Sequence, residues 1–461
     1  MPQFYTLIFG LSRVAAVLAA AALLFMDTLC SVGVILVLLF GMLGTGVWVF
    51  ASIALVAVLS LFFLQGMSPA RIGSIASSII YRYSSGWELS AIPMFIWMGE
   101  IIFRTDISSR LFRGLSPFVD YIPGRLLHTN VLGCTLFAAV SGSSPATTAT
   151  VGKISIGELD KRGYDPRVAL GSLAGAGSLG LLIPPSIVMI VYGILAEQSV
   201  SRLFAAGVLP GLMIAGLYSA YIILRAKLTP EIAPHDKPDH KLADFGRALV
   251  DLLPLGVLMG IVLGSIYTGI ATPSEAAAVG VLTAIGITLA TRQFSFGLMR
   301  DTLMSALRTS TMVCSILITA ALMSTAMGYL HIPADVAAGI GALDLPPWGL
   351  LVVLSLFYLG LGFFLDGNSI VVMSLPIALP LAVQAGFDPI WFGVYLVLMV
   401  EMAQVTPPVG FNLFVLQGIS GRSIGYVARA AFPFFLLMLV GVVLLALFPG
   451  IALFLPNLLY G

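Results

Sequence analysis

Charged residues are scarce in this 461-residue sequence: Asp, Glu, Lys and Arg together make up 9%, whereas 59% of the residues are hydrophobic. A soluble domain cannot bury so much apolar side chain, so the composition indicates a polytopic membrane protein in a lipid bilayer. The net charge of +1 and the lack of a basic run give no support to a nucleic-acid partner.

Cysteine and histidine are also few. The three cysteines, Cys30, Cys134 and Cys314, lie far apart in or beside apolar runs, so they indicate neither a disulfide framework nor a metal cluster. The four histidines have no ligand spacing. The sequence has no HExxH motif and no Ser/His/Asp set at a plausible depth. We therefore expect no enzyme activity and no cofactor.

A small polar stretch, SGSSP at 141–145, lies between two apolar arms, residues 126–140 and 146–156. Each arm is shorter than the roughly 20 residues that span a bilayer. Basic residues flank both arms, so the pattern predicts a hairpin that enters and leaves the membrane by the same face. Irregular backbone at mid-membrane is tolerated only inside protein or beside a cavity. The tip is therefore either a substrate or ion site, or a notch where helices approach closely.

The chain contains an internal repeat. The motif GYDP at 163–166 recurs as GFDP at 386–389, and 389 − 166 = 223. The pair Pro184-Pro185 recurs as Pro407-Pro408 with the same offset. The two halves are thus copies of one unit. The offset also predicts a second hairpin that turns at LDGNS, residues 365–369.

The distribution of basic residues indicates that the two copies are inverted. Lys and Arg gather at the ends of the first hairpin, which are therefore cytoplasmic by the positive-inside rule. No Lys or Arg occurs between Arg308 and Arg422, so the second hairpin should open outward. Equivalent hairpins that face opposite sides define an inverted-topology repeat, the architecture of secondary transporters. We predict an all-α polytopic membrane protein with two re-entrant hairpins and two broken helices.

This organisation divides the chain into four parts and several elements. The parts are an extra N-terminal transmembrane helix at 1–28, a first repeat at 29–225 with a hairpin at 125–162 and a broken helix at 165–197, a cytoplasmic linker at 226–247, and a second repeat at 248–455 with a hairpin at 347–384 and a broken helix at 388–417. We also expect interfacial helices at 68–86 and 106–121, an amphipathic helix at 294–308 before a span at 309–329, and a last span at 430–454.

Four interruptions should meet near mid-membrane: two hairpin tips and two Pro-Pro breaks. Ser144, Thr406 and Asp366 precede the helix starts and suit N-caps, with Pro at the first helical position. Helix N-termini can hold an anion, while freed carbonyls and Ser, Thr and Asp oxygens suit Na⁺. The Pro-Pro pairs are either such site-forming breaks or simple kinks.

Asp366 is the strongest single candidate, because a carboxylate in an apolar span is costly and usually functional. It could be an ion ligand, a helix cap only, or a proton relay. Asn368, Thr406 and Asn412 could supply neutral oxygens. Three further carboxylates interrupt apolar runs and are expected to be structural, either capped or paired: Glu100, Glu275 and Glu401.

At these residues the sequence resembles a known family. SGSSPATTATVGKISI, KRGYDPRVALGSLAGAGSLGLLIPPSI, GFFLDGNSIVVMSLPIALP and GFDPIWFGVYLVLMVEMAQVTPPVGFNLFV are similar to the large (DctM-like) membrane subunit of tripartite ATP-independent periplasmic (TRAP) transporters, over about residues 30–455. The resemblance implies a Na⁺-driven, elevator-type importer of organic acids in the bacterial inner membrane. It also implies a small four-helix membrane subunit and a periplasmic substrate-binding protein as partners. Residues 1–28 depart from the family pattern.

The resemblance also implies the site residues, with Na⁺ as the coupling ion. The first ion site would use Ser141, Gly142, Ser143, Ser144, Pro184 and Pro185, and the second Asp366, Asn368, Thr406, Pro407 and Pro408. Substrate contacts are assigned to Ser144, Thr147, Ser186 and Asn412. The alternative is a stand-alone Na⁺/dicarboxylate symporter or ion antiporter of similar architecture.

Overall fold

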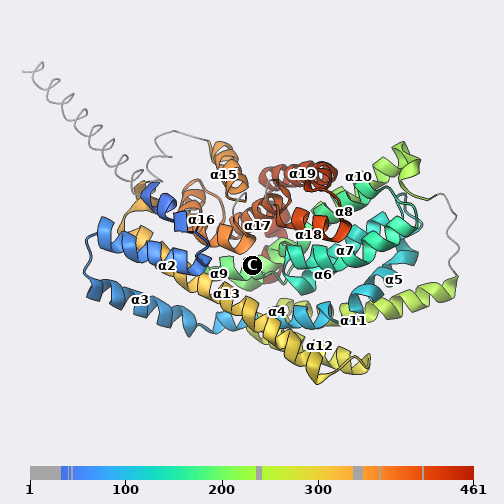
Figure 1. The fold of residues 1–461 in the computed structure, drawn as a ribbon, viewed down its shortest axis with the longest axis horizontal. Helices are drawn as coiled ribbons and strands as arrows, with labels where there is room; N and C mark the ends of the chain where they lie inside the picture. Colours follow the sequence, from blue (N-terminus) through green and yellow to red (C-terminus); the bar gives the residue numbers. More distant parts are fainter. Residues whose placement is uncertain are drawn as a thin grey trace, which may run out of the picture. The chain divides into compact units, whose positions relative to one another are not determined.

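The computed structural model describes residues 33–39, 41–42, 45–234, 241–335, 346–362, 365–407 and 410–461, and this part of the chain contains helices and no strand. Six of its helices are long and apolar enough to cross a membrane: α10 (Val200–Leu228), α11 (Leu242–Tyr267), α12 (Pro273–Ala290), α13 (Phe296–Tyr329), α16 (Gly367–Gln384) and α19 (Ile424–Leu447) (Figure 1). The prediction of an all-α, multi-pass membrane protein is confirmed. The expected helix at 1–28 lies outside the described residues.

Shorter elements lie between these helices. They are α2 (Val49–Leu59), a π-helical turn η1 (Ser60–Leu64), α3 (Pro69–Ser84), a 3₁₀ turn η2 (Trp87–Ser90), α4 (Ala91–Phe103), α5 (Ile107–Val119), α6 (Leu127–Ser141), α7 (Ser144–Lys161), α8 (Pro166–Gly177), a 3₁₀ turn η3 (Ser178–Leu181), α9 (Ile187–Leu195), a 3₁₀ turn η4 (Pro230–Ile232), α15 (Pro347–Leu361), α17 (Pro389–Val405), α18 (Phe411–Ser420) and α20 (Gly450–Tyr460).

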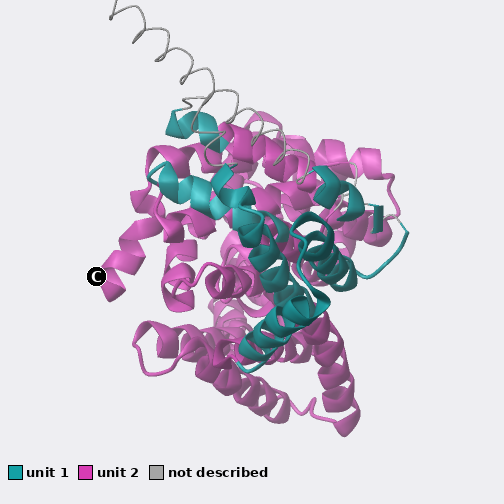
Figure 2. Cartoon of the chain, turned by 90° about the vertical axis from the view of Figure 1, so that its left-hand side faces the viewer, with its two compact units in different colours: residues 1–85, 315–351, 373–386 teal, residues 86–314, 352–372, 387–461 magenta. Residues whose placement is uncertain are grey.

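The chain forms two compact units (Figure 2). Unit 1 comprises Met1–Ser85, Ser315–Leu351 and Met373–Gly386, and unit 2 comprises Gly86–Cys314, Val352–Val372 and Phe387–Gly461. The tip-facing ends of both hairpins and both broken helices therefore belong to unit 2. Within that unit α6, α7 and α8 pack against one another, and α8 packs against α19.

Helix starts follow the repeat seen in the sequence. Helix α7 starts at Ser144 and α16 at Gly367, so 367 − 144 = 223. Asp165 caps α8 by accepting a hydrogen bond from the Arg167 amide (2.7 Å), and Asp388 caps α17 by accepting one from the Ile390 amide (2.7 Å). A capping carboxylate followed by Pro at the first helical position explains why both helices begin where they do. The inversion of the two halves stays a prediction.

Two elements differ from the sequence prediction. The amphipathic helix at 294–308 and the span at 309–329 form one continuous helix, α13. In the first half α3 ends just before Gly86, whose counterpart in the second half is Thr309 (309 − 86 = 223), so no glycine interrupts α13 there. The prediction of a single last span at 430–454 is also wrong, because α19 ends before Pro449 and a separate helix, α20, follows.

The linker is shorter than predicted. Helix α10 runs to Leu228 and α11 starts at Leu242, so helical residues enter both ends of the expected 226–247 segment. Ring contacts lie beside the start of α11, where Phe118 packs edge-on against Phe245 with their centroids 5.4 Å apart.

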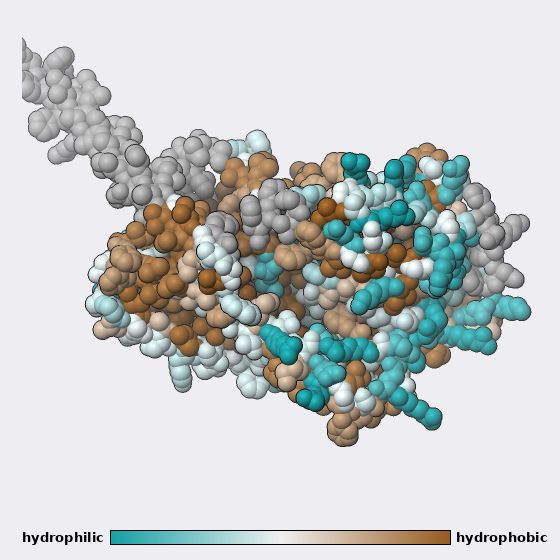
Figure 3. All heavy atoms as spheres, viewed as in Figure 1, coloured by the Kyte–Doolittle hydropathy of each residue, from teal (hydrophilic) through white to brown (hydrophobic). Residues whose placement is uncertain are grey.

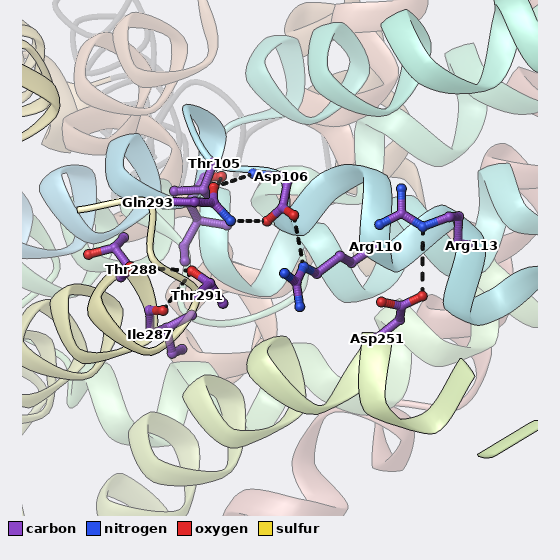
Figure 4. Close-up of polar contacts among 10 residues, drawn as sticks. Thr105, Asp106, Arg110, Arg113, Asp251, Ile287, Thr288, Thr291 and Gln293 are labelled. Carbon is purple, nitrogen blue, oxygen red and sulfur yellow. Dashed lines mark hydrogen bonds and ion pairs between the residues drawn. The ribbon is translucent and has the colours of Figure 1, made fainter. Parts of the chain in front are cut away.

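Polar contacts bind the predicted interfacial helix α5 to two neighbours in unit 2 (Figure 4). Asp106 accepts a hydrogen bond from Arg110 Nε (2.9 Å) and one from the Gln293 amide, while its own backbone N–H donates to Gln293 (3.0 Å). Arg113 lies 3.7 Å from Asp251 of α11. Burial raises the pKa of the Asp106 carboxyl, but the hydrogen bonds from Gln293 and Arg110 outweigh burial and hold this pKa below its usual value.

The surface is apolar where a lipid-facing helix is expected. Helix α2 and the following turn expose Leu55, Phe62 and Phe63, and the surface over α2 is predominantly hydrophobic in Figure 3. Such contiguous apolar surface suits contact with a bilayer and not with water.

Candidate functional site

The tip of the first hairpin, formed by α6 and α7, is a tight turn of small polar residues. Helix α6 ends at Ser141, and Gly142 follows in the left-handed region (φ +55°) that glycine adopts without strain. Ser143 is extended and α7 begins at Ser144, so the N-cap is Ser143 and the prediction of Ser144 as the cap was wrong. The Ser141 hydroxyl accepts the Ser143 N–H (3.2 Å) and pairs with the Thr147 hydroxyl, closing the turn.

The first broken helix is interrupted over residues 178–186, the first break. Helix α8 ends at Gly177, η3 forms a single 3₁₀ turn, and α9 starts only at Ile187. The buried pair Pro184-Pro185, joined by a cis bond, lies within this stretch. Ser186 caps α9 by accepting the Met189 N–H (3.3 Å). The interruption thus contains the predicted Pro-Pro pair but begins six residues before it, directly after the last residue of α8.

The hairpin tip and the first break touch backbone to backbone. A Cβ atom built on Gly180 would lie 2.8 Å from the Ser143 carbonyl carbon and 2.8 Å from the Ser144 Cα. One built on Gly142 would lie 3.3 Å from the Pro185 carbonyl oxygen. The structure therefore brings together the residues predicted for the first ion site, and it adds Gly180 to them.

The tip of the second hairpin, formed by α15 and α16, carries a carboxylate that caps α16. Asp366 immediately precedes α16 and accepts hydrogen bonds from the Asn368 N–H (3.2 Å) and the Ser369 hydroxyl. Its predicted cap role is present. The last three residues of the predicted turn at 365–369 are helical, because α16 begins at Gly367.

The second break separates α17 from α18. Thr406 ends α17 as its C-cap, and its hydroxyl donates to the Met402 carbonyl (2.6 Å), so the prediction of Thr406 as an N-cap was wrong. The residue before a proline avoids the helical region, which explains the extended Thr406. Pro407 is exposed, Pro408 lies outside the described residues, and the N-cap of α18 is Gly410.

Some of the buried side-chain polar atoms without hydrogen-bond partners lie at the second hairpin and the second break. Among the described residues, Asn368 Oδ1, Gln404 Oε1 and both amide atoms of Asn412 have none. The Gln404 amide nitrogen would lie 3.2 Å from a Cβ built on Gly367, the first residue of α16. Buried polar atoms normally have partners, so these are candidates for a bound ion or substrate. Neutral oxygens are ligands that Na⁺ accepts.

Glu401, expected from the sequence to be a capped or paired structural carboxylate, joins α17 to the first hairpin tip and the first break by hydrogen bonds. It is buried in α17, its Oε1 accepts the Leu181 N–H (2.7 Å), and its Oε2 lies 2.6 Å from the Ser144 hydroxyl. Ser178, whose carbonyl also accepts from the Ser144 hydroxyl (3.2 Å), is its repeat counterpart, since 401 − 178 = 223. That relation was readable in the sequence and could have identified Glu401.

The other two carboxylates in apolar runs behave as predicted. Glu100 pairs with Arg104 on its own helix (3.4 Å). Glu275 accepts from the Thr272 N–H (2.8 Å) in a capping box at the start of α12. Both are structural carboxylates.

Few charged side chains are buried near the hairpin tips and the breaks. Within the described residues, Glu401 is the one Asp, Glu, Lys or Arg among the buried side chains, and no cluster of three or more His, Cys, Asp or Glu side chains forms a metal site. An anion bound here would have to be held by backbone N–H groups and hydroxyls and not by a buried cation.

Comparison with known proteins gives consistent matches over most of the chain. Residues 36–451 match the family described as "Tripartite ATP-independent periplasmic transporter, DctM component". The chain is 37% identical to the C4-dicarboxylate TRAP transporter large permease protein DctM of Pseudomonas aeruginosa, over 85% of this chain and 91% of that protein. It is 33% identical to the ectoine/5-hydroxyectoine TRAP transporter large permease protein UehC of Ruegeria pomeroyi, over 81% of this chain and 87% of that protein.

A solved structure supports the fold at lower sequence similarity. The crystal structure of the YdaH transporter of Alcanivorax borkumensis aligns with 83% of this chain and 90% of its own, with a TM-score of 0.59 and 15% identity. At that identity the likeness concerns the fold alone.

Proposed function

Because the chain belongs to the DctM family, the large permease component of tripartite ATP-independent periplasmic transporters, we propose that it imports an organic acid by Na⁺-driven symport. Binding of Na⁺ at the two hairpin tips would organise the site for a carboxylate substrate. The single observation that carries this proposal is the meeting of the first hairpin tip, the first break and Glu401 of the second broken helix in one unit.

The site chemistry suits a small cation together with an anion. Hydroxyl and amide oxygens of Ser141, Asn368 and Asn412, with Asp366 at the second tip, are hard donors of the kind Na⁺ accepts. The N-terminal amides of α7 and α9 carry partial positive charge and would face the carboxylate. In this proposal the Ser144 backbone N–H and the hydroxyls of Thr147 and Ser186 add neutral hydrogen bonds to the substrate. Binding of Na⁺ beside the carboxylate would offset its charge without a buried Lys or Arg.

We further propose that the two halves are inverted repeats and that a moving unit carries the site between the two faces. Matching helix starts at an offset of 223 support the repeat (367 − 144 = 223). The contrast in basic residues between the two hairpins supports the inversion. Alternating access by movement of one part against a scaffold is the usual mechanism of such folds.

The substrate class and partners follow from the family in this proposal. Relatives are named for C4-dicarboxylates, for ectoines and for isethionate. We propose a C4-dicarboxylate or related organic acid, delivered by a periplasmic binding protein, with a small four-helix membrane subunit completing the permease in the inner membrane.

The test is uptake into proteoliposomes that hold this chain with its small subunit. Radiolabelled succinate and malate would be offered with and without the binding protein, under an inward Na⁺ gradient or an equal K⁺ gradient. We expect uptake only with both Na⁺ and the binding protein. Uptake in K⁺ alone would refute Na⁺ coupling. Na⁺-driven uptake without the binding protein would favour a stand-alone symporter.

A further inference from the structure

Glu401 is a buried carboxyl group, and no Lys or Arg is buried among the residues that the structure describes. Its side chain is 1% exposed. Its partners are the Leu181 N–H, 2.7 Å from Oε1, and the Ser144 hydroxyl, 2.8 Å from Oε1 and 2.6 Å from Oε2. A carboxyl group is costly to place in an apolar interior, so its retention needs a reason beyond packing.

Each of its two partners belongs to a different interruption of the fold. Ser144 is the first residue of α7, at the tip of the first hairpin, and Leu181 is the last residue of η3, in the first break. Glu401 itself lies one turn before Val405, where α17 ends at the second break. One side chain therefore links three of the four predicted interruptions.

The same turn of α17 also contacts the second hairpin. A Cβ atom built on Gly367 would lie 2.9 Å from Val400 Cγ1 and 3.2 Å from Leu181 Cδ1. Val400, the residue before Glu401, and Leu181, a hydrogen-bond partner of Glu401, thus lie against the start of α16, directly after Asp366. Helix α17 therefore contacts residues at both hairpin tips.

The hydrogen bonds of Glu401 also orient a predicted ion ligand. A serine hydroxyl has one proton and two lone pairs. The shortest contact of Ser144, to Glu401 Oε2, directs this proton at the carboxyl and leaves the lone pairs for a cation. Breaks in helices leave N–H groups without partners, and Glu401 supplies the acceptor for that of Leu181. Such partners behind metal ligands fix ligand geometry and affinity.

We propose that Glu401 is the positioning residue of the first ion site, where it holds Ser144 and the first break in the geometry that binds the cation. Because it is carried by the second broken helix, it makes that geometry depend on the position of α17 and thereby couples the two hairpin tips. The assignment of Ser144 as an ion ligand rests on the proposed function.

The first test compares Glu401→Gln and Glu401→Leu with the matched control Glu100→Gln, in the complex of both membrane subunits with the binding protein. The half-saturating Na⁺ concentration and the maximal rate of uptake would be measured separately. Losing a partner of a metal ligand typically costs about 10- to 100-fold in affinity, so Glu401→Leu should raise the half-saturating Na⁺ concentration at least tenfold. Glutamine keeps an acceptor for Leu181 and a hydrogen-bonding group for Ser144, and should restore most of the affinity. Glu100→Gln should leave it unchanged.

The second test does not depend on transport. Hydrogen–deuterium exchange of the purified complex would follow peptides that cover residues 141–147 and 178–182. Faster exchange in both peptides is expected for Glu401→Leu and for Glu401→Gln combined with Ser144→Ala, but not for Glu100→Gln. A wild type without Na⁺-dependent uptake would sink the proposed function, and this exchange result alone would then decide the positioning role. Unchanged exchange, or a Glu401→Leu variant that loses maximal rate at wild-type Na⁺ affinity, overturns the proposal.

Discussion

Substituting alanine for Gly180 should damage the proposed first ion site through steric overlap with the backbone of Ser143 and Ser144. The new Cβ atom would lie 2.8 Å from the Ser143 carbonyl carbon and oxygen and from the Ser144 Cα, whereas ordinary van der Waals contact begins at 3.4 Å. The overlap is therefore about 0.6 Å against three backbone atoms that no side-chain rotation can move. Overpacking of this kind costs about 1–3 kcal/mol. If all of it opposed ion binding, Na⁺ affinity would fall about 5- to 150-fold.

The control is Gly157→Ala in α7, on the first hairpin. A Cβ atom at Gly157 has no neighbour within 4 Å, and alanine in a helix interior is favoured over glycine by up to about 1 kcal/mol. Both variants would be purified with the small subunit, and their thermal unfolding midpoints and Na⁺-dependent uptake compared with wild type. We expect Gly180→Ala to lose Na⁺ affinity and thermal stability while Gly157→Ala keeps both. Wild-type Na⁺ affinity and midpoint in Gly180→Ala would show that the tip and the first break are not in contact in the working protein.

Three further predictions concern other parts of the chain. Asp366→Ala and Asp366→Asn should both lose Na⁺-dependent uptake if Asp366 is an ion ligand; asparagine caps helices as well as aspartate does, so uptake kept only in Asp366→Asn would make Asp366 a cap. Asp106 lies between α4 and α5, outside the membrane-spanning helices, and its lowered pKa stabilises the fold above the unfolded-state pKa of 3.8; this contribution is lost as pH falls through the lower folded-state pKa. The unfolding midpoint of wild type relative to Asp106→Asn should therefore fall as the pH is lowered below 3.8, by a small amount because the Asp106 side chain is 42% exposed; a constant difference would contradict this. Single cysteines at Tyr121 and Trp348, in a background without native cysteines, should react with impermeant maleimide from opposite sides of the membrane, and labelling from one side would contradict the inverted repeat.

The sequence by itself determined the elements and most of their boundaries. Low charge and long apolar runs indicate that the chain folds in a lipid bilayer. No water is available there to hydrogen-bond the backbone N–H and C=O groups, and α-helices pair these groups within each segment. Aspartate followed by proline fixed the starts of α8 and α17, because cap and φ preference act within a few residues. The offset of 223 located the second hairpin and its carboxylate Asp366 (389 − 166 = 223). Such signals are local, or repeat at a fixed spacing, and can be read without coordinates.

The tertiary structure decided what the interruptions touch. Glu401 lies 257 residues from Ser144 and 220 from Leu181 along the chain, so no local pattern gives those hydrogen bonds. Nothing in the sequence distinguishes Gly180 from the other glycines, of which there are 48 in total, and only its packing against Ser143 shows that a side chain would not fit there. The N-cap of α7 is Ser143, one residue before the predicted Ser144, and that of α18 is Gly410, four residues after the predicted Thr406, so the motif located the two helix starts only approximately. Spacing and composition determine helices, but the approach of distant segments depends on side chains and backbone that meet only after folding.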